Sequence, residues 1–412
     1  MLEPMLVHHV PDAISRGQRP GDVRRVNRAT ALELLRERPQ GRAELARAMG
    51  LSKAALGGLI SDLTLEGLVL EHPPTAIARG RYPAPLQVNA NRFSVLGLHL
   101  APHGLEVGLY DALGVQQDVL YAPSHVGDGI ERVLAQVIQT SRALMARVRK
   151  IKIGEVAALT IATPGPLDAV RGIVLGAPKF PELNGINLKL KLEQALKLPV
   201  RLERDVNAAA TGYLRQTKTK NFVYILVTGP GIGASVVINR AVYRGTHGFA
   251  GEFGHVSLDP KGLVCSCGNR GCLERYASSE AIENNYKKRS RKTASIAEIT
   301  LRARANDPKA QAVFDEAGTA IGLAAVTLVN LFDPSQLVLS SSGTNFTDLL
   351  TPSLKRQLTK RAYPYLNLGA QLKIENVTLE HPVAPGAAEC VLEAIYRGEI
   401  AIPKSKTEVM MG

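Results

Sequence analysis

The segment Gly251-Glu252-Phe253-Gly254-His255, followed shortly by Cys265-Ser266-Cys267-Gly268-Asn269-Arg270-Gly271-Cys272-Leu273-Glu274, is the most specific pattern in this 412-residue chain. It places three cysteines within eight positions and one histidine upstream of them. Zinc takes four tetrahedral nitrogen or sulfur ligands, and three thiolates with one imidazole are a common structural set. The sequence therefore predicts a zinc site formed by His255, Cys265, Cys267 and Cys272.

The cysteine count also favours a metal over disulfides. The chain has four cysteines, and three of them lie in this one segment. Few, clustered cysteines are typical of a metal site in a reducing compartment. The alternative is a set of reduced cysteines in an ordinary loop. Cys390 stands alone in an apolar run and is expected to be a core residue.

Length and composition indicate a soluble protein of two or three domains. Hydrophobic residues make up 45% of the chain and charged residues 21%, which is ordinary for globular proteins. We find no stretch long and apolar enough to cross a bilayer, and the first twenty residues lack the unbroken apolar segment of a signal peptide. We therefore expect a cytoplasmic protein with no membrane partner.

The formal net charge of +13 is only a weak argument for a polyanionic partner. Residues 1–92 carry 13 Lys or Arg and 9 Asp or Glu, and the remainder carries 37 and 28. The positive charge is spread over the whole chain, so a case for DNA binding must rest on sequence pattern.

The first ninety residues read as an arm followed by a DNA-binding head. Residues 1–20 lack periodicity and predict a flexible arm. Residues 21–90 predict a winged helix-turn-helix, with apolar residues at helical spacing from Val23 to Leu35, a short helix at 43–49 and a third helix capped by Ser52. Two short apolar runs, at 68–70 and 86–88, predict the strands of the wing.

The third helix of such a head enters the major groove with its N-terminal residues against base edges. Two arginines on the predicted wing could reach the minor groove or phosphates. Gly57 and Gly58 lower the stability of this helix. Either a close approach of the backbone to DNA or tight packing against another helix would explain why glycines stand there. A winged helix used for protein contacts is the alternative. The candidate DNA contacts are Ser52, Lys53, Ala54, Gly57, Gly58, Arg79 and Arg81.

From Phe93 onward strands alternate with helices, which predicts an α/β architecture over more than 300 residues. Long helices are expected at 130–148 and 315–332. The expected strands lie at 94–100, 106–110, 156–161, 223–227 and 337–339.

The order Glu-x-Gly-His, Cys-x-Cys and Cys-x-Glu between Glu252 and Glu274 resembles the signature of the ROK family (repressors, open reading frames and sugar kinases). The resemblance extends from about Arg24 to Arg397, because the repressor branch also begins with a winged helix-turn-helix. It implies two actin-like (ribonuclease-H-like) α/β lobes around a cleft. The expected bounds are 91–204 with 386–402 for the first lobe and 205–385 for the second.

The resemblance also implies a set of sugar-binding residues. His255 would place one ring nitrogen on zinc and the other against a sugar hydroxyl. Glu252 and Glu274 match the family's sugar-binding glutamates, and a carboxylate can accept two hydroxyls. Asp205 matches the catalytic aspartate of the kinases.

The same comparison predicts that kinase activity is lost, with Asp205 as a vestigial base. Thr228-Gly229-Pro230-Gly231-Ile232-Gly233 resembles the second phosphate loop, but Leu100-Ala101-Pro102-His103 stands where active members have a Gly-Gly-Thr-like turn. The preceding aspartate is missing as well, and Pro102 removes one N–H from any phosphate cradle. Near the adenosine, the usual glycine pair is replaced in Ser340-Ser341-Ser342-Gly343.

Two cations stand where the family's kinases carry neutral groups. Arg204 replaces the asparagine before the catalytic aspartate, and Lys179 stands near the position of a sugar-contacting asparagine. One hypothesis is that they bind an anionic effector such as a sugar phosphate or sugar acid. The other is that they face solvent or pair with neighbouring carboxylates.

Three classes of function follow from these patterns. The first is a transcription repressor, a homodimer or homotetramer that binds a palindromic double-stranded DNA operator and responds to a sugar or sugar phosphate. The second is an ATP-dependent sugar kinase with a regulatory DNA-binding head. The third is an interaction protein with an inactive sugar domain. We expect the repressor, because it alone uses the head, the zinc site and the altered phosphate loop together.

Overall fold

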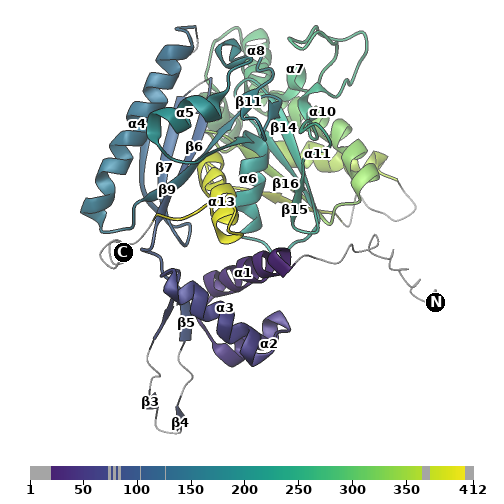
Figure 1. Cartoon of the computed structure of the whole chain (residues 1–412). Helices are drawn as coiled ribbons and strands as arrows, with labels where there is room; N and C mark the ends of the chain where they lie inside the picture. Colours follow the sequence, from purple (N-terminus) through teal and green to yellow (C-terminus); the bar gives the residue numbers. More distant parts are fainter. Residues whose placement is uncertain are drawn as a thin grey trace, which may run out of the picture. The chain divides into compact units, whose positions relative to one another are not determined.

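The computed structural model describes residues 20–72, 76–77, 80–81, 85–102, 104–125, 127–363 and 372–403. The chain divides into two compact units, one formed by Met1–Asn89 with Glu393–Gly412 and the other by Ala90–Leu392 (Figure 1). The expected arm at 1–20 lies outside the described residues except for Pro20.

The first unit contains the helices and strands of a winged helix-turn-helix. Its helices are α1 (Pro20–Glu37), α2 (Arg42–Met49) and α3 (Lys53–Leu65). A three-stranded sheet of order β1-β5-β2 is formed by β1 (Gln40–Gly41), β5 (Pro85–Val88) and β2 (Val69–Glu71). The strands β3 (Ala76–Ile77) and β4 (Gly80–Arg81) pair with each other as an antiparallel hairpin.

The turn between α2 and α3 follows from two residues. Gly50 ends α2 in the left-handed conformation at φ 64°, which a glycine adopts without a Cβ penalty. Ser52 then begins α3, because its side chain accepts a hydrogen bond from the backbone N–H of Ala55 at 3.2 Å. Leu56, Ile60 and Leu63 line the buried face of α3.

The last helix, α13 (Val383–Tyr396), belongs to both units, since the division falls between Leu392 and Glu393. Within the first unit, the guanidinium of Arg36 lies over the ring of Tyr396, 5.1 Å from its centroid. Residues 393–402 thus group with the head in this division. The exact lobe bounds remain a prediction.

The second unit contains two five-stranded sheets, each with its own hydrophobic core. The first lobe is built on the sheet of order β12-β9-β6-β7-β8. Helices α4 (Ile130–Ile151) and α5 (Leu188–Leu196) pack against it, and a small hairpin and a 3-10 helix complete the lobe. The strands and the 3-10 helix are β6 (Ser94–Ala101), β7 (Gly104–Asp111), β8 (Gln116–Ala122), β9 (Val156–Thr163), β10 (Leu167–Asp168), β11 (Ile173–Val174), η1 (Pro181–Leu183) and β12 (Val200–Arg204).

The second lobe is built on the sheet of order β15-β14-β13-β16-β17. Its strands are β13 (Phe222–Val227), β14 (Ile232–Ile238), β15 (Ala241–Tyr243), β16 (Gln336–Ser341) and β17 (Lys373–Asn376). The helices are α7 (Glu274–Ala277), α8 (Ser279–Ser290), α9 (Ile296–Arg304), α10 (Pro308–Phe332) and α11 (Thr347–Arg361), with the 3-10 helix η2 (Phe253–His255). Helix α6 (Asp205–Leu214) and the start of α13 share a third cluster of buried residues with strands of both sheets.

Our expectation that no stretch could cross a bilayer was wrong for α10 by length and composition. Its most apolar window has a mean hydropathy of 1.5. More than half of that window, 56%, is buried in the structure, and its inner face joins the core of the second lobe. Helix α10 is apolar because other helices pack against it on several sides. Its length and composition are therefore only weak evidence for a membrane span.

Candidate functional site

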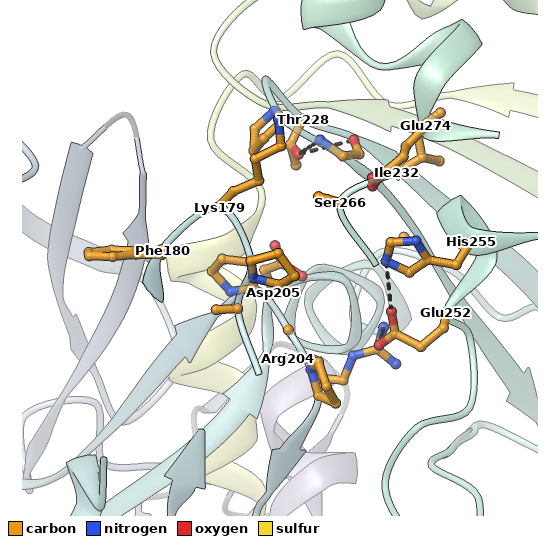
Figure 2. A pocket seen from close by; sticks show the side chains of 18 of the residues that line it. Lys179, Phe180, Arg204, Asp205, Thr228, Ile232, Glu252, His255, Ser266 and Glu274 are labelled. Carbon is orange, nitrogen blue, oxygen red and sulfur yellow. Dashed lines mark hydrogen bonds and ion pairs between the residues drawn. The ribbon is translucent and has the colours of Figure 1, made fainter. Parts of the chain in front are cut away.

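A pocket lies between the two lobes and collects every residue that the sequence proposes for sugar binding. Figure 2 shows Asp205 within it, Lys179 and Arg204 on opposite sides of Asp205 in this view, and Glu252 beside His255. The first lobe contributes the stretches Pro164–Pro166 and Ala177–Phe180, which the sequence reasoning largely missed. The predicted residues in the lining are Lys179, Arg204, Asp205, Glu252, His255 and Glu274.

The four predicted metal ligands come together at one side of this pocket. Their ligand atoms all lie within 4.8 Å of one another. The Sγ atom of Cys265 is 3.7 Å from Nδ1 of His255, and the Sγ atoms of Cys267 and Cys272 are also 3.7 Å apart. These separations match the spacing of ligands around a tetrahedral ion with metal–sulfur bonds of about 2.3 Å.

The chemistry of this group fits a bound cation. Burial and the neighbouring thiols of Cys267 and Cys265 raise the pKa of Cys272 to about 12. A divalent ion reverses this effect, because coordination deprotonates thiols and neutralises the thiolates. His255, Cys265, Cys267 and Cys272 could therefore hold a metal ion, which would fix the loop from residue 255 to residue 274.

Local structure explains how so short a segment forms the cluster. Gly271 has φ +70°, and a Cβ there would lie 1.9 Å from the carbonyl oxygen of Asp259. The absence of a side chain lets the chain return against its own backbone, so that Leu258 donates its N–H to Gly271 O at 2.8 Å. Cys272 is thereby brought beside Ser257 through an isolated antiparallel bridge.

His255 connects the cluster with the pocket. Its Nδ1 atom faces Cys265, whereas Nε2 lies 4.0 Å from a carboxylate oxygen of Glu252 in the pocket lining. One ring nitrogen could therefore bind a metal, and the other faces the pocket; its contact with a sugar hydroxyl stays a prediction.

Asp205 begins α6 directly after β12, and its Oδ1 atom accepts a hydrogen bond from Val206 N at 2.7 Å. Burial raises the pKa of Asp205, while the neighbouring Arg204 guanidinium lowers it. The carboxyl group lies in the pocket, and its Oδ2 atom accepts no hydrogen bond from the residues that the structure describes. It can accept a hydrogen bond from a ligand hydroxyl or act as a base toward one.

Both cations in the pocket are paired with carboxylates. Arg204 Nη2 lies 2.8 Å from Oε1 of Glu252, and the Arg204 side chain is only 5% exposed. Lys179 Nζ lies 3.0 Å from Oε2 of Glu280 at the start of α8. Of the two alternatives that the sequence left open, this geometry matches pairing with neighbouring carboxylates. Sequence reasoning missed Glu280, because it lies 101 residues from Lys179 in the chain.

The two phosphate-loop segments differ in structure. The turn from Thr228 to Gly231 joins β13 to β14, and the segment from Thr228 to Gly233 lines the pocket. Thr228 donates its N–H to Gly231 O and accepts the N–H of Gly231 at its side-chain oxygen. The other segment is the tight connection between β6 and β7, where Ala101 pairs directly with Gly104. Pro102 occupies this connection and has no N–H to offer a phosphate.

The candidate DNA contacts lie at the start of α3. Ser52, Lys53, Ala54 and Gly58 are exposed, and Gly57 is half-buried. A Cβ added at Gly57 or Gly58 would meet no described atom within 4 Å, so tight packing does not explain these glycines. Arg79 lies outside the described residues, and only the backbone of Arg81 is described, within β4.

Together, the head, the two lobes and the pocket beside a cysteine–histidine cluster define a sugar-kinase-like domain joined to a winged helix-turn-helix. The family model for ROK, described as the ROK family, matches residues 123–392. This match covers more than half of the chain, and the chain belongs to the ROK family.

Relatives of similar length are named as transcriptional regulators. The chain is 28% identical over 383 residues to a xylose repressor of Bacillus spizizenii, covering 90% of this chain and 96% of the relative. It is 24% identical over 390 residues to the DNA-binding transcriptional dual regulator NagC of Escherichia coli, covering 91% of this chain and 94% of NagC.

Solved structures agree with this grouping. A ROK family transcriptional regulator, a homolog of the E. coli MLC protein, matches with a TM-score of 0.78 and 26% identity, over 92% of this chain and 98% of that one. A ROK family glucokinase from Streptomyces griseus in complex with glucose and AMPPNP matches with a TM-score of 0.63 and 25% identity, over 72% and 98%. The glucokinase match covers a smaller share of this chain than the regulator match does.

Proposed function

We propose that this protein is a DNA-binding transcriptional repressor that responds to a sugar bound between the lobes of its ROK domain. The observation that carries the proposal is the combination, in one chain, of a winged helix-turn-helix with a pocket that gathers Asp205, Glu252, His255 and Glu274. Carboxylates and an imidazole nitrogen are suitable acceptors for the hydroxyls of a pyranose.

In this proposal the metal is Zn²⁺, held by His255, Cys265, Cys267 and Cys272. A structural zinc ion supplies rigidity to the loop that carries His255 and Glu274. Acceptors held in place before the sugar arrives need not be ordered on binding, which favours affinity.

We infer that ATP-dependent phosphoryl transfer has been lost. Pro102 in the β6–β7 connection removes one backbone N–H expected around the phosphates, and the serines at 340–342 stand where a glycine pair is expected near the adenosine. Asp205 would then serve as a hydrogen-bond acceptor for a sugar hydroxyl. The competing function is a sugar kinase, which the retained Asp205 and the Thr228–Gly233 loop favour. It requires sugar-dependent ATP turnover that disappears in Asp205→Ala.

The proposed partners follow from the repressor function. A symmetric homodimer or homotetramer in the cytoplasm would read a palindromic operator with half-sites about one helical turn, or a multiple of it, apart. Ser52, Lys53, Ala54, Gly57 and Gly58 would meet the major groove, and Arg79 and Arg81 would meet the minor groove or phosphates.

The test is a fluorescence-anisotropy titration of the zinc-loaded protein with DNA from upstream of its own gene. It is run at fixed salt with nonspecific competitor and repeated with xylose, glucose, N-acetylglucosamine and their phosphates. We expect competitor-resistant binding that one of these ligands changes by about tenfold or more. Binding no tighter than to competitor DNA would refute the repressor function.

A further inference from the structure

Two ion pairs cross the pocket from one lobe to the other. Arg204 ends β12 of the first lobe, and its partner Glu252 precedes η2 of the second. Lys179 follows β11 of the first lobe, and its partner Glu280 lies in α8 of the second. Both pairs therefore join the same two lobes, and their cations, Lys179 and Arg204, lie on opposite sides of Asp205 in the view of Figure 2.

Arg204 is fixed to more than one group of the second lobe. Its guanidinium donates to the carbonyl oxygen of Ala250 and reaches that of Gly251 at 3.5 Å, in addition to the carboxylate of Glu252. Gly251 in turn accepts the N–H of Ala234 in β14 at 3.0 Å. The arginine thus connects the end of β12 with the sheet of the second lobe through a turn that has little room to move.

That turn cannot readily shift to release the arginine. Gly251 has φ +88°, and a Cβ there would lie 1.9 Å from Ala234 O, so the backbone is in direct contact with β14. Oε1 of Glu252 is buried and takes up the ion pair with Arg204, whereas the other carboxylate oxygen, Oε2, lies 4.0 Å from Nε2 of His255 in the pocket lining. The arginine therefore orients Glu252 through one oxygen and leaves the other toward the pocket, where it can accept a hydrogen bond from a ligand hydroxyl.

The Lys179 pair is anchored on both sides as well. Lys179 precedes Phe180, which is fully buried in the core of the first lobe. Glu280 donates its backbone N–H to Gly229 O at 2.9 Å, so it is held at the loop between β13 and β14. Lys179 and Glu280 are 37% and 45% exposed, which makes this the weaker of the two pairs.

The charge around the pocket argues against an anionic ligand. The lining holds the cations Lys179 and Arg204 and the carboxylates Asp205, Glu252 and Glu274, and Lys179 is further matched by Glu280. A zinc ion held by three thiolates and one imidazole would add a net negative charge. A phosphate or carboxylate on the effector would enter a site whose cations are already paired.

We propose that Lys179 and Arg204 are positioning residues that hold the two lobes together across the pocket, and that the effector is an uncharged sugar. The inference about the effector rests on the proposed sugar-sensing function; the inference about the ion pairs does not. Breaking either pair loosens the lobes without effector, and neither cation contacts the sugar.

The test of the ion pairs is hydrogen–deuterium exchange of the full-length, zinc-loaded protein without sugar. Arg204→Asn should speed exchange in the turn at 250–252 by about tenfold or more, because it removes the ion pair to Glu252 and the hydrogen bonds to the carbonyl oxygens of Ala250 and Gly251. Lys179→Glu should speed exchange at the start of α8 by about two- to fivefold, and the swap K179E/E280K should restore it. Lys191→Glu is the matched control, since Lys191 pairs with Glu131 within the first lobe at 3.6 Å.

Calorimetric titration with xylose, N-acetylglucosamine and N-acetylglucosamine 6-phosphate tests the effector class. We expect an uncharged sugar to bind at least about tenfold more tightly than the sugar phosphate. The double variant K179E/E280K should bind that uncharged sugar with an affinity within about twofold of that of the parent protein. If the exchange rates in Lys179→Glu and Arg204→Asn equal those in the control variant Lys191→Glu, the ion-pair proposal is overturned. Tighter binding of the phosphate than of both uncharged sugars overturns the inference that the effector is uncharged, and its loss in Lys179→Glu would assign the phosphate to Lys179. If none of the three ligands binds, sugar sensing fails, and the exchange rates still decide the role of the ion pairs.

Discussion

Single glycines control whether the metal-binding loop forms, and two of them form a matched pair. Both Gly268 and Gly271 have positive φ, but a Cβ on Gly268 meets nothing within 4 Å, whereas one on Gly271 meets the backbone of Asp259. Gly268→Ala should cost about 1 kcal/mol from its backbone conformation alone. Gly271→Ala should cost on the order of 3–4 kcal/mol and reduce zinc content. Calorimetry and metal analysis check this, and equal effects of the two changes would contradict it.

Glu106, a single residue in β7, should make stability depend on pH. It is 5% exposed, and burial raises its pKa to about 7. His381 Nδ1 lies 3.6 Å away, and Tyr110 and Tyr121 also interact electrostatically with Glu106. Because burial raises the pKa of Glu106 in the folded state, its contribution to the free energy of unfolding is fully present below pH 4.5. That contribution is lost as the pH rises through 7 and the carboxyl ionises.

Glu106→Gln stays neutral and should therefore gain stability relative to the parent protein between pH 5 and pH 8. The gain should be about 3 kcal/mol at most, from a pKa change of about 2.5 units. Thermal unfolding of both proteins across this range checks the prediction. A difference between them that is constant with pH would show that Glu106 is ionised throughout.

At the scale of the element, helix α3 has two glycines that the fold does not need. Because an added Cβ meets nothing at Gly57 or Gly58, each change to alanine should stabilise α3 by about 0.5–1 kcal/mol. We expect the same changes to weaken binding to upstream DNA by about tenfold, since a methyl group would separate the helix from the groove. Thermal unfolding and anisotropy measure the two effects, with competitor DNA as the control. Unchanged DNA affinity would exclude a close approach at these glycines.

At the scale of the whole molecule, the metal site and the sugar site should respond together. His255 belongs to both, and Cys265 Sγ lies 3.0 Å from Oε1 of Glu274 in the pocket lining. Removal of zinc with a chelator, or Cys272→Ser, should lower sugar affinity by about 10- to 100-fold. Cys390→Ser is the control, because Cys390 is buried in a different core cluster. Calorimetric titration before and after zinc is added back measures the effect, and unchanged affinity would separate the two sites.

The sequence by itself determined the features that depend on neighbours in the chain. The four candidate metal ligands lie between His255 and Cys272, and their spacing and residue types indicate a metal site before any folding. The cap at Ser52 and the α/β alternation are likewise local signals, and the structure and the family match confirm the fold that they predict. The bounds of the lobes and the individual DNA contacts stay predictions.

Only the tertiary structure decided which charges meet and which apolar surfaces are covered. Lys179 and Glu280 are 101 residues apart, and no local pattern links them. The apolar residues of α10 have the same composition whether lipid or protein surrounds them, so the sequence could not show that the helix packs in the core of the second lobe. Pairing and burial depend on contacts between distant segments, and those contacts exist only once the lobes have folded around their separate cores.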